Sequence, residues 1–173
     1  GRGDGIAFLG YNSADMLVLM FACARLGAIL VPLNWRLAPG EHAYILDHSS
    51  ASAVVVEPEF EAAVAEIRGR IGGYRPVRYG AAGDGWESFE ALLAAADGPD
   101  RDPRAGPDDP ALIVYTSGTT GRPKGAVLTQ QALVFNAVNS TAAHDMTSND
   151  VVLTNLPMFH VGGLNIQTTP ALH

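Results

Sequence analysis

The chain contains one stretch that decides its fold, Tyr115-Thr116-Ser117-Gly118-Thr119-Thr120-Gly121-Arg122-Pro123-Lys124-Gly125. Short apolar runs, residues 111–115 and 126–128, lie on either side of it. Apolar, β-branched runs bounded by glycine and proline are typical of strands. We therefore expect strand, loop and strand in that order. Glycines 118, 121 and 125 can adopt positive φ and let the backbone approach a ligand closely.

The loop carries the groups that bind a polyphosphate. Successive backbone N–H groups in a glycine-rich loop form a concavity for anions. Hydroxyl groups donate to phosphate oxygens, and Lys124, the only lysine of the chain, adds a mobile positive charge. The pattern predicts a phosphate-binding loop rather than a hairpin that binds nothing. Its hydroxyl residues are Thr116, Ser117, Thr119 and Thr120.

The nucleotide loop G-x-x-x-x-G-K-[ST] is the obvious alternative, and it does not match. Counted from Gly118, its second glycine would fall at Pro123, and the residue after Lys124 is Gly125 rather than Ser or Thr. That loop also opens a helix, whereas residues 125–129 predict a strand.

Strands and helices alternate along the chain, which favours a three-layer α/β fold with a mainly parallel sheet and helices on both faces. The helix capped by Ser13 and ended by Gly27 is apolar on nearly every side, so we expect it between layers. Expected strands span residues 6–9, 29–33, 53–56, 77–79, 111–115, 126–128 and 151–156. Expected helices span residues 13–26, 39–48, 59–69, 86–96 and 129–144, and either another helix or an irregular turn begins at His160.

The proline and aspartate content of residues 97–110 divides the chain. We interpret this stretch as an exposed connector rather than a functional acidic cluster. It separates a first α/β segment, residues 1–96, from a phosphate-loop segment, residues 111–173. The chain starts without methionine and ends inside an apolar pattern, so both ends look cut.

The composition argues against nucleic-acid binding and against attachment to or passage through a membrane. The net charge of −7 argues against a nucleic-acid or anionic membrane surface, because both attract clustered Lys and Arg. Cys23 is the only cysteine, so no internal disulfide forms, and a buried thiol in a reduced, cytoplasmic setting fits. The longest apolar run, residues 16–24, is far shorter than the roughly 20 residues of a membrane span.

Three segments together carry a family resemblance over essentially the whole chain. Residues 116–125 resemble the phosphate-loop signature of the adenylate-forming superfamily, which includes acyl- and aryl-CoA synthetases, luciferases and peptide-synthetase adenylation domains. Leu156-Pro-Met-Phe-His160-Val-Gly-Gly-Leu164 resembles the motif that follows in that family, and it favours fatty-acyl or aryl-CoA ligases. Residues 27–37 resemble its early strand and turn.

The resemblance implies part of the large N-terminal, AMP-binding domain of an acyl-CoA synthetase, with the C-terminal domain absent. Such an enzyme activates a carboxylic acid with ATP and Mg²⁺ and transfers the acyl group to CoA. The chain alone is expected to be inactive. Two alternatives stay open: a non-catalytic nucleotide-binding or scaffold module, and an adenylation domain that loads a carrier-protein thiol.

The resemblance also assigns site residues, although no catalytic residue and no metal ligand is identified. His160 is either a residue of the acyl and adenylate pocket or a packed imidazole at a helix start. Asn34, Arg36 and Glu41 are expected to fix a turn. His42 and His48 have no cysteine nearby to suggest a metal site, and Asp145, Asn149 and Asp150 are expected in surface turns. The residues expected to hold the β- and γ-phosphates are Thr116, Ser117, Gly118, Thr119, Thr120, Gly121 and Lys124.

Overall fold

The computed structural model describes residues 1–69, 72–96, 105–116 and 121–173. Its centre is a seven-stranded sheet in the order β5-β4-β3-β1-β2-β6-β7. Every neighbouring pair is parallel except β6 and β7, which are antiparallel. The strands are β1 (Gly5–Leu9), β2 (Ile29–Pro32), β3 (Ala51–Val56), β4 (Arg75–Arg78), β5 (Glu87–Ser88), β6 (Pro110–Thr116) and β7 (Lys124–Thr129).

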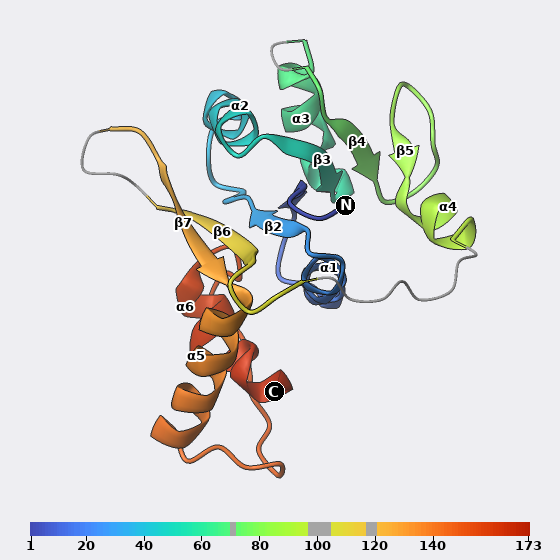
Figure 1. Cartoon of the computed structure of the whole chain (residues 1–173). Helices are drawn as coiled ribbons and strands as arrows, with labels where there is room; N and C mark the ends of the chain where they lie inside the picture. The colour runs from blue at the N-terminus through green and yellow to red at the C-terminus, as the bar shows by residue number, and fades with distance from the viewer. Residues whose placement is uncertain (70–71, 97–104, 117–120) are drawn as a thin grey trace.

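Helices cover both faces of this sheet, as the sequence predicted. Figure 1 shows α2 and α3 on one face and α1 on the other. None of the helices in the described residues is long and apolar enough to cross a bilayer. The helices are α1 (Ala14–Leu26), α2 (Pro39–His48), η1 (Pro58–Phe60), α3 (Glu61–Ile67), α4 (Phe89–Ala94), α5 (Gln130–Ala143), α6 (Val161–Gly163), η2 (Leu164–Thr168) and η3 (Pro170–Leu172).

The helix ends follow local capping signals. The Ser13 hydroxyl accepts from the backbone N–H of Met16 at 3.3 Å, and Gly27 ends α1 with φ of 69°. Thr129 caps α5 by accepting from the N–H of Ala132 at 3.2 Å. Such caps satisfy backbone groups that a helix leaves unpaired at its ends. The predicted starts of the helices at residues 13 and 129 are therefore confirmed.

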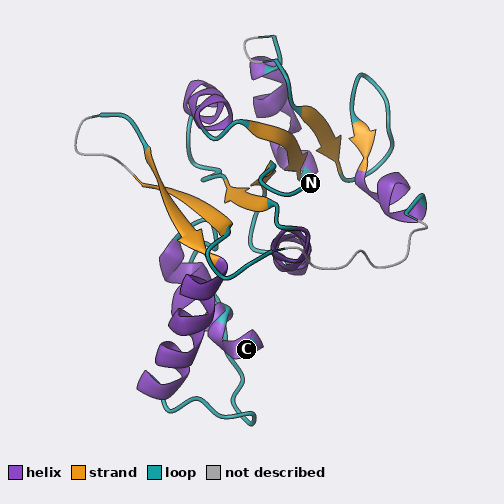
Figure 2. Cartoon of the chain, in the orientation of Figure 1, coloured by secondary structure: helices purple, strands orange, loops and turns teal. Residues whose placement is uncertain are grey.

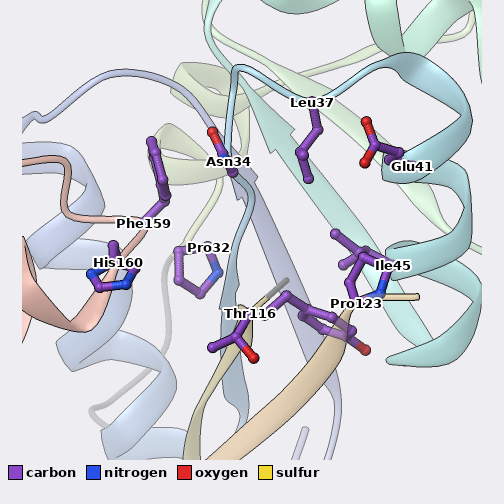
Figure 3. A pocket seen from close by; sticks show the side chains of 10 residues that line it. Pro32, Asn34, Leu37, Glu41, Ile45, Thr116, Pro123, Phe159 and His160 are labelled. Carbon is purple, nitrogen blue, oxygen red and sulfur yellow. The ribbon is translucent and has the colours of Figure 1, made fainter. Parts of the chain in front are cut away.

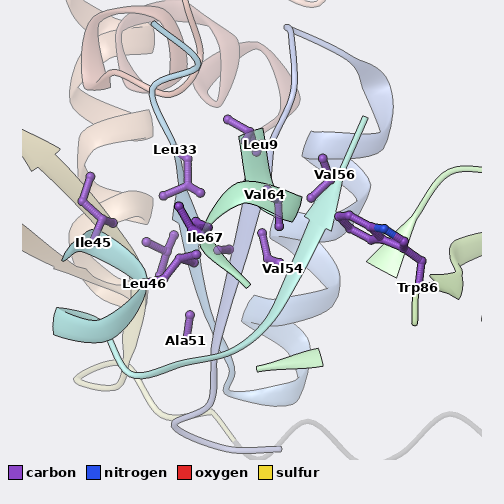
Figure 4. Packing of buried hydrophobic residues seen from close by; sticks show 12 residues of the cluster. Leu9, Leu33, Ile45, Leu46, Ala51, Val54, Val56, Val64, Ile67 and Trp86 are labelled. Atoms are coloured by element: carbon purple, nitrogen blue, oxygen red, sulfur yellow. The ribbon is translucent and has the colours of Figure 1, made fainter. Parts of the chain in front are cut away.

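Two apolar clusters hold the layers together, one on each face of the sheet. The first joins the sheet to α2 and α3, where Ile45 and Ile67 meet Leu9 and Val54 from the strands (Figure 4). The second joins α1 to the opposite face and includes the buried Cys23. Each large aliphatic side chain that is fully buried in this way contributes about 1.5–3 kcal/mol.

The predicted strand at residues 151–156 is wrong. Figure 2 shows a loop between α5 and α6, and the side chains of Val151 and Leu153 are 97% and 84% exposed. A strand needs a neighbouring strand for its backbone groups, and no described strand pairs with this segment. Its apolar pattern alone was the basis of the prediction.

The helix predicted at residues 86–96 starts later than expected. Glu87 and Ser88 form β5, which pairs with β4. Ser88 then accepts from the N–H of Ala91 at 3.2 Å, so it caps α4 and the helix begins at Phe89. The serine is the stronger start signal because its hydroxyl satisfies an end-of-helix donor, whereas Trp86 cannot.

The prediction that α1 lies between two layers does not hold for the described residues. Met16, Met20 and Cys23 pack against the sheet, whereas Val18 and Phe21 on the other side are 63% and 49% exposed. The division of the chain at residues 97–110 stays a prediction, because residues 97–104 lie outside the described residues. Leu112 of β6 pairs with Leu30 of β2, so both segments contribute to one sheet.

Candidate functional site

The predicted strand, loop and strand around residues 116–125 occur as the antiparallel hairpin of β6 and β7. Tyr115 pairs with Gly125, and Thr116 pairs with Lys124. The pairing brings the first and last members of the predicted phosphate-binding set to the same end of the hairpin. Four other members, Ser117, Gly118, Thr119 and Thr120, lie outside the described residues.

The described members of this set differ in their surroundings. Lys124 is exposed at the first position of β7, so its ammonium group is accessible to a ligand. Gly121 has φ of 84°, and an added Cβ would meet no atom within 4 Å. The position therefore requires glycine for its left-handed backbone and not for lack of space.

The role of Gly125 differs from the expectation that it adopts positive φ and lets the backbone approach a ligand. It lies in β7, and it is not among the described glycines with positive φ. A Cβ at this position would lie 2.7 Å from Cγ2 of Ile113 and 3.2 Å from the ring of Tyr115. Glycine is needed here because the neighbouring strand's side chains occupy the space, rather than for approach to an anion.

A pocket of about 240 Å³ opens beside this end of the hairpin. Figure 3 shows Phe159 and His160 on one side of it and Glu41 and Ile45 of α2 on the other. The pocket combines apolar walls with a few polar groups, which is typical of small-molecule sites. Its lining residues are Pro32, Asn34, Leu37, Glu41, Ile45, Tyr115, Thr116, Pro123, Phe159 and His160.

The place of His160 in an acyl and adenylate pocket stays a prediction. His160 lies at a helix start, as the other alternative expected, but it is exposed rather than packed. It is the N-cap of α6, where Nδ1 accepts from the backbone N–H of Gly162 at 3.0 Å. The same side chain lines the pocket together with Thr116. Because Nδ1 accepts a hydrogen bond, the neutral ring carries its proton on Nε2. The helix cap thus fixes the orientation of a pocket residue.

The turn before α2 is fixed by the residues that the sequence analysis assigned to it. Asn34 Oδ1 accepts from the N–H of Arg36 at 3.0 Å, and Glu41 Oε2 accepts from the N–H of Ala38 at 2.9 Å. Asn34 and Glu41 also line the pocket, a position that the sequence analysis missed. Asp150 likewise closes a turn at Thr147, as expected.

Both histidines of α2 have hydrogen-bond partners. His42 Nε2 is 2.9 Å from the backbone oxygen of Asn34, and burial lowers the pKa of His42, which favours the neutral ring. His48 Nδ1 lies 2.7 Å from the hydroxyl of Tyr115. The described residues contain no group of three or more His, Cys, Asp or Glu side chains that could hold a metal ion.

Aromatic contacts from α2 support the hairpin near the predicted phosphate loop. The Tyr44 hydroxyl donates to the backbone oxygen of Pro123 at 3.3 Å. Tyr44 stacks on His48 with 5.4 Å between ring centroids, and His48 contacts Tyr115 as described above. Burial raises the pKa of Tyr115, so its phenol stays protonated and can donate to His48. The sequence analysis gave no signal for these contacts, which join distant positions.

The chain is similar in sequence to a known protein family and to several curated proteins. A model of the AMP-binding enzyme family matches residues 1–173. The chain is 54% identical over 168 residues to an indoleacetate–CoA ligase of Aromatoleum aromaticum, covering 96% of this chain and 33% of that ligase. It is 38% identical over 170 residues to a feruloyl-CoA synthase of an Amycolatopsis species, covering 98% of this chain and 32% of the synthase.

The fold is also similar to the folds of solved structures. The crystal structure of ATP-bound MatB from Rhodopseudomonas palustris has a TM-score of 0.81 at 32% identity, covering 99% of this chain and 34% of that one. The chain spans about a third of the length of the curated relatives named above. The match of the family model to every residue shows that the chain belongs to the AMP-binding enzyme family.

Proposed function

We propose that this chain is part of a ligase that joins a carboxylic acid to CoA through an acyl-adenylate. In the first step a carboxylate oxygen attacks the α-phosphorus of ATP, the bond to the β-phosphate oxygen breaks, and pyrophosphate leaves. In the second step the CoA thiol, having lost its proton, attacks the acyl carbon and AMP leaves. The relatives that support the proposal are named as an indoleacetate–CoA ligase and a feruloyl-CoA synthase.

One observation in the structure carries the proposal. The hairpin of β6 and β7 brings Thr116 and Pro123, two residues of the predicted phosphate loop, to the same pocket as Asn34 and His160. A pocket that is lined both by residues of a predicted phosphate loop and by apolar side chains suits a reaction between a polyphosphate and an organic acid. Preorganised donors in such a loop stabilise charge that develops on the leaving pyrophosphate.

The donors in this chain fit the nucleotide's phosphates. Thr116 supplies a hydroxyl, Gly121 a left-handed backbone position and Lys124 an exposed positive charge. These residues would bind and orient the β- and γ-phosphates. Mg²⁺ would arrive with ATP, since it is usually held by substrate phosphates and one or two carboxylates, and it would neutralise phosphate charge.

We further propose an aromatic acid, such as an arylacetate, as the substrate. The relative with 54% identity is named for indoleacetate, and a second relative is named for feruloyl-CoA. Phe159, Leu37 and Ile45 give the pocket apolar walls, and flat aromatic rings pack favourably on such walls. The polar groups of the pocket would orient the reacting carboxylate.

The experiment is acid-dependent exchange of labelled pyrophosphate into ATP by the full-length protein. Indoleacetate, ferulate and a long-chain fatty acid are compared, and thioester formation with CoA is followed separately. We expect exchange with the aromatic acids at higher kcat/KM than with the fatty acid. Exchange with the fatty acid alone would overturn the aromatic assignment, and exchange with none of a broad acid panel would overturn the ligase.

The 173-residue chain, assayed beside the full-length protein, is expected to give no comparable exchange. Adenylation requires the base, the ribose, the phosphates and the acid to be held together, and this positioning supplies much of the rate. A loop alone should bind ATP weakly, because a few exposed hydrogen bonds must offset the freedom that the ligand loses on binding. Exchange by the short chain near the full-length rate would contradict this expectation.

A further inference from the structure

We propose that Asn12 is a positioning residue that fixes the backbone carrying Phe159 and His160 into the pocket wall. The proposal rests on the proposed function. Asn12 lies between β1 and α1, and its side chain bridges to residues far along the sequence. Its Nδ2 donates to the backbone oxygen of Leu156 at 2.8 Å, and its Oδ1 accepts from the backbone N–H of Met158 at 2.8 Å.

The side-chain type is well suited to this bridge. A primary amide offers a donor and an acceptor side by side, so it can satisfy a carbonyl and an N–H two residues apart. The orientation of the amide is settled by its partners, since the carbonyl of Leu156 only accepts and the N–H of Met158 only donates. Aspartate at this position would keep the acceptor for Met158 and lose the donor for Leu156.

The bridge attaches a segment whose N-terminal side does not pair with the described sheet, although the hydroxyl of Thr154 is hydrogen-bonded to that of Thr168. Val151 and Leu153 are 97% and 84% exposed, and no described strand pairs with residues 151–156. Met158 is only 3% exposed and belongs to the apolar cluster under α1. The two hydrogen bonds from Asn12 and the buried Met158 side chain therefore anchor the chain immediately before Phe159.

The backbone next to Asn12 is itself held in place by Glu57. The N–H of Tyr11 donates to Glu57 Oε2 at 2.8 Å, which links the end of β1 to the end of β3. Beyond the bridge, Phe159 contacts the ring of Trp35 with 6.3 Å between centroids, and His160 caps α6. Asn12 thus connects the end of β1 to the segment that carries Phe159 and His160, two side chains that line the pocket.

The test uses the full-length protein with Asn12→Ala and Asn12→Asp, and with Ile67→Val as a matched control. Ile67 is fully buried in α3 under the other face of the sheet, so its variant loses packing without touching the bridge. Two quantities are measured for each: hydrogen exchange of the backbone amides of residues 156–164, and the KM values for the acid and for ATP in pyrophosphate exchange.

We expect faster amide exchange and a KM for the acid raised about tenfold in both Asn12 variants, since net losses of one or two hydrogen bonds correspond to such factors. The KM for ATP should stay within about twofold, because the bridge does not touch the β6–β7 hairpin. Ile67→Val should lower thermal stability without this selective change. Asn12→Asp is the informative variant if Asn12→Ala does not fold.

The outcomes separate this proposal from the proposed function. Unchanged amide exchange in the Asn12 variants overturns the bridge, and faster exchange with an unchanged KM for the acid overturns its positioning role. If the unaltered protein activates none of the acids, the proposed function fails. Amide exchange then decides the positioning alone: faster exchange extending through His160 supports it, and unchanged exchange overturns it.

Discussion

Lys124 is the residue with the clearest predicted role in phosphate binding. It is the only lysine of the chain, and it is exposed at the start of β7, opposite Thr116. In the full-length protein, Lys124→Ala should lower the rate of adenylation by roughly 10²-fold, the size typical of one lost contact to transition-state charge. Pyrophosphate exchange measures the rate, and thermal unfolding should show little change because the side chain is exposed.

Two results would decide the role of Lys124. Lys124→Arg should retain part of the activity, because the charge remains while the geometry of the donors changes. A Lys124→Ala variant that adenylates at the unaltered rate, with the same dependence on ATP concentration, would remove the phosphate role assigned to this residue.

For Gly125 the prediction concerns the stability of the protein rather than ligand binding. An alanine Cβ would lie 2.7 Å from Cγ2 of Ile113, so Gly125→Ala should destabilise the protein by about 1–3 kcal/mol, as overpacked sites do. Ile113→Ala should cost less in the Gly125→Ala background than alone. Chemical denaturation of the four proteins of the cycle measures the coupling.

Gly40 supplies the control for this cycle. It lies in the first turn of α2, where an added Cβ meets no atom within 4 Å. Gly40→Ala should therefore leave stability unchanged or raise it by up to about 1 kcal/mol. If Gly125→Ala behaves like Gly40→Ala, the steric explanation for Gly125 is wrong.

Helix ends could be predicted where their signals are local. Ser13, Gly27 and Thr129 act on backbone groups within a few residues, so the ends of α1 and α5 could be predicted from the sequence alone. A strand depends on a partner that is distant in sequence. Residues 151–156 have the apolar composition of a strand but no partner in the described sheet.

The same limit explains which part of the candidate site was predicted. The glycine, hydroxyl and lysine pattern at residues 116–125 is contiguous, so its chemistry could be inferred from composition and order. The bridge from Asn12 to Leu156 and Met158 and the contact from His48 to Tyr115 join residues 67–146 positions apart. The pairing of β6 with β2 and the packing of α2 bring His48 and Tyr115 together. The burial of Met158 in the apolar cluster of α1 accompanies the contacts of Asn12.

The contact between α2 and β6 through His48 and Tyr115 can be tested by mutation. The hydroxyl of Tyr115 is 2.7 Å from His48 Nδ1, so Tyr115→Phe and His48→Ala each lose this bond at a cost of about 1 kcal/mol. Because both remove the same interaction, the double variant should cost less than the sum of the two single variants. Additive losses in chemical denaturation would show that the pair does not hold the hairpin against α2.

An exposed apolar surface lies between α1 and α5. A groove of about 320 Å³ there is lined mainly by apolar side chains, including Phe21, Leu133 and Leu172. Phe21 and Val134 are 49% and 51% exposed. Contiguous apolar surface of this kind promotes association in water. The 173-residue chain should therefore self-associate at high concentration.

Light scattering and sedimentation of the chain across a concentration series test this expectation, with Phe21→Gln and Leu93→Gln as a matched pair. Leu93 is 60% exposed on α4 and does not line the groove, so both variants replace one exposed apolar side chain with the same polar one. Phe21→Gln should weaken association, because it removes a large aromatic surface from the groove. Leu93→Gln should change association little. Equal effects of the two variants would mean that general surface hydrophobicity, and not the groove between α1 and α5, drives self-association.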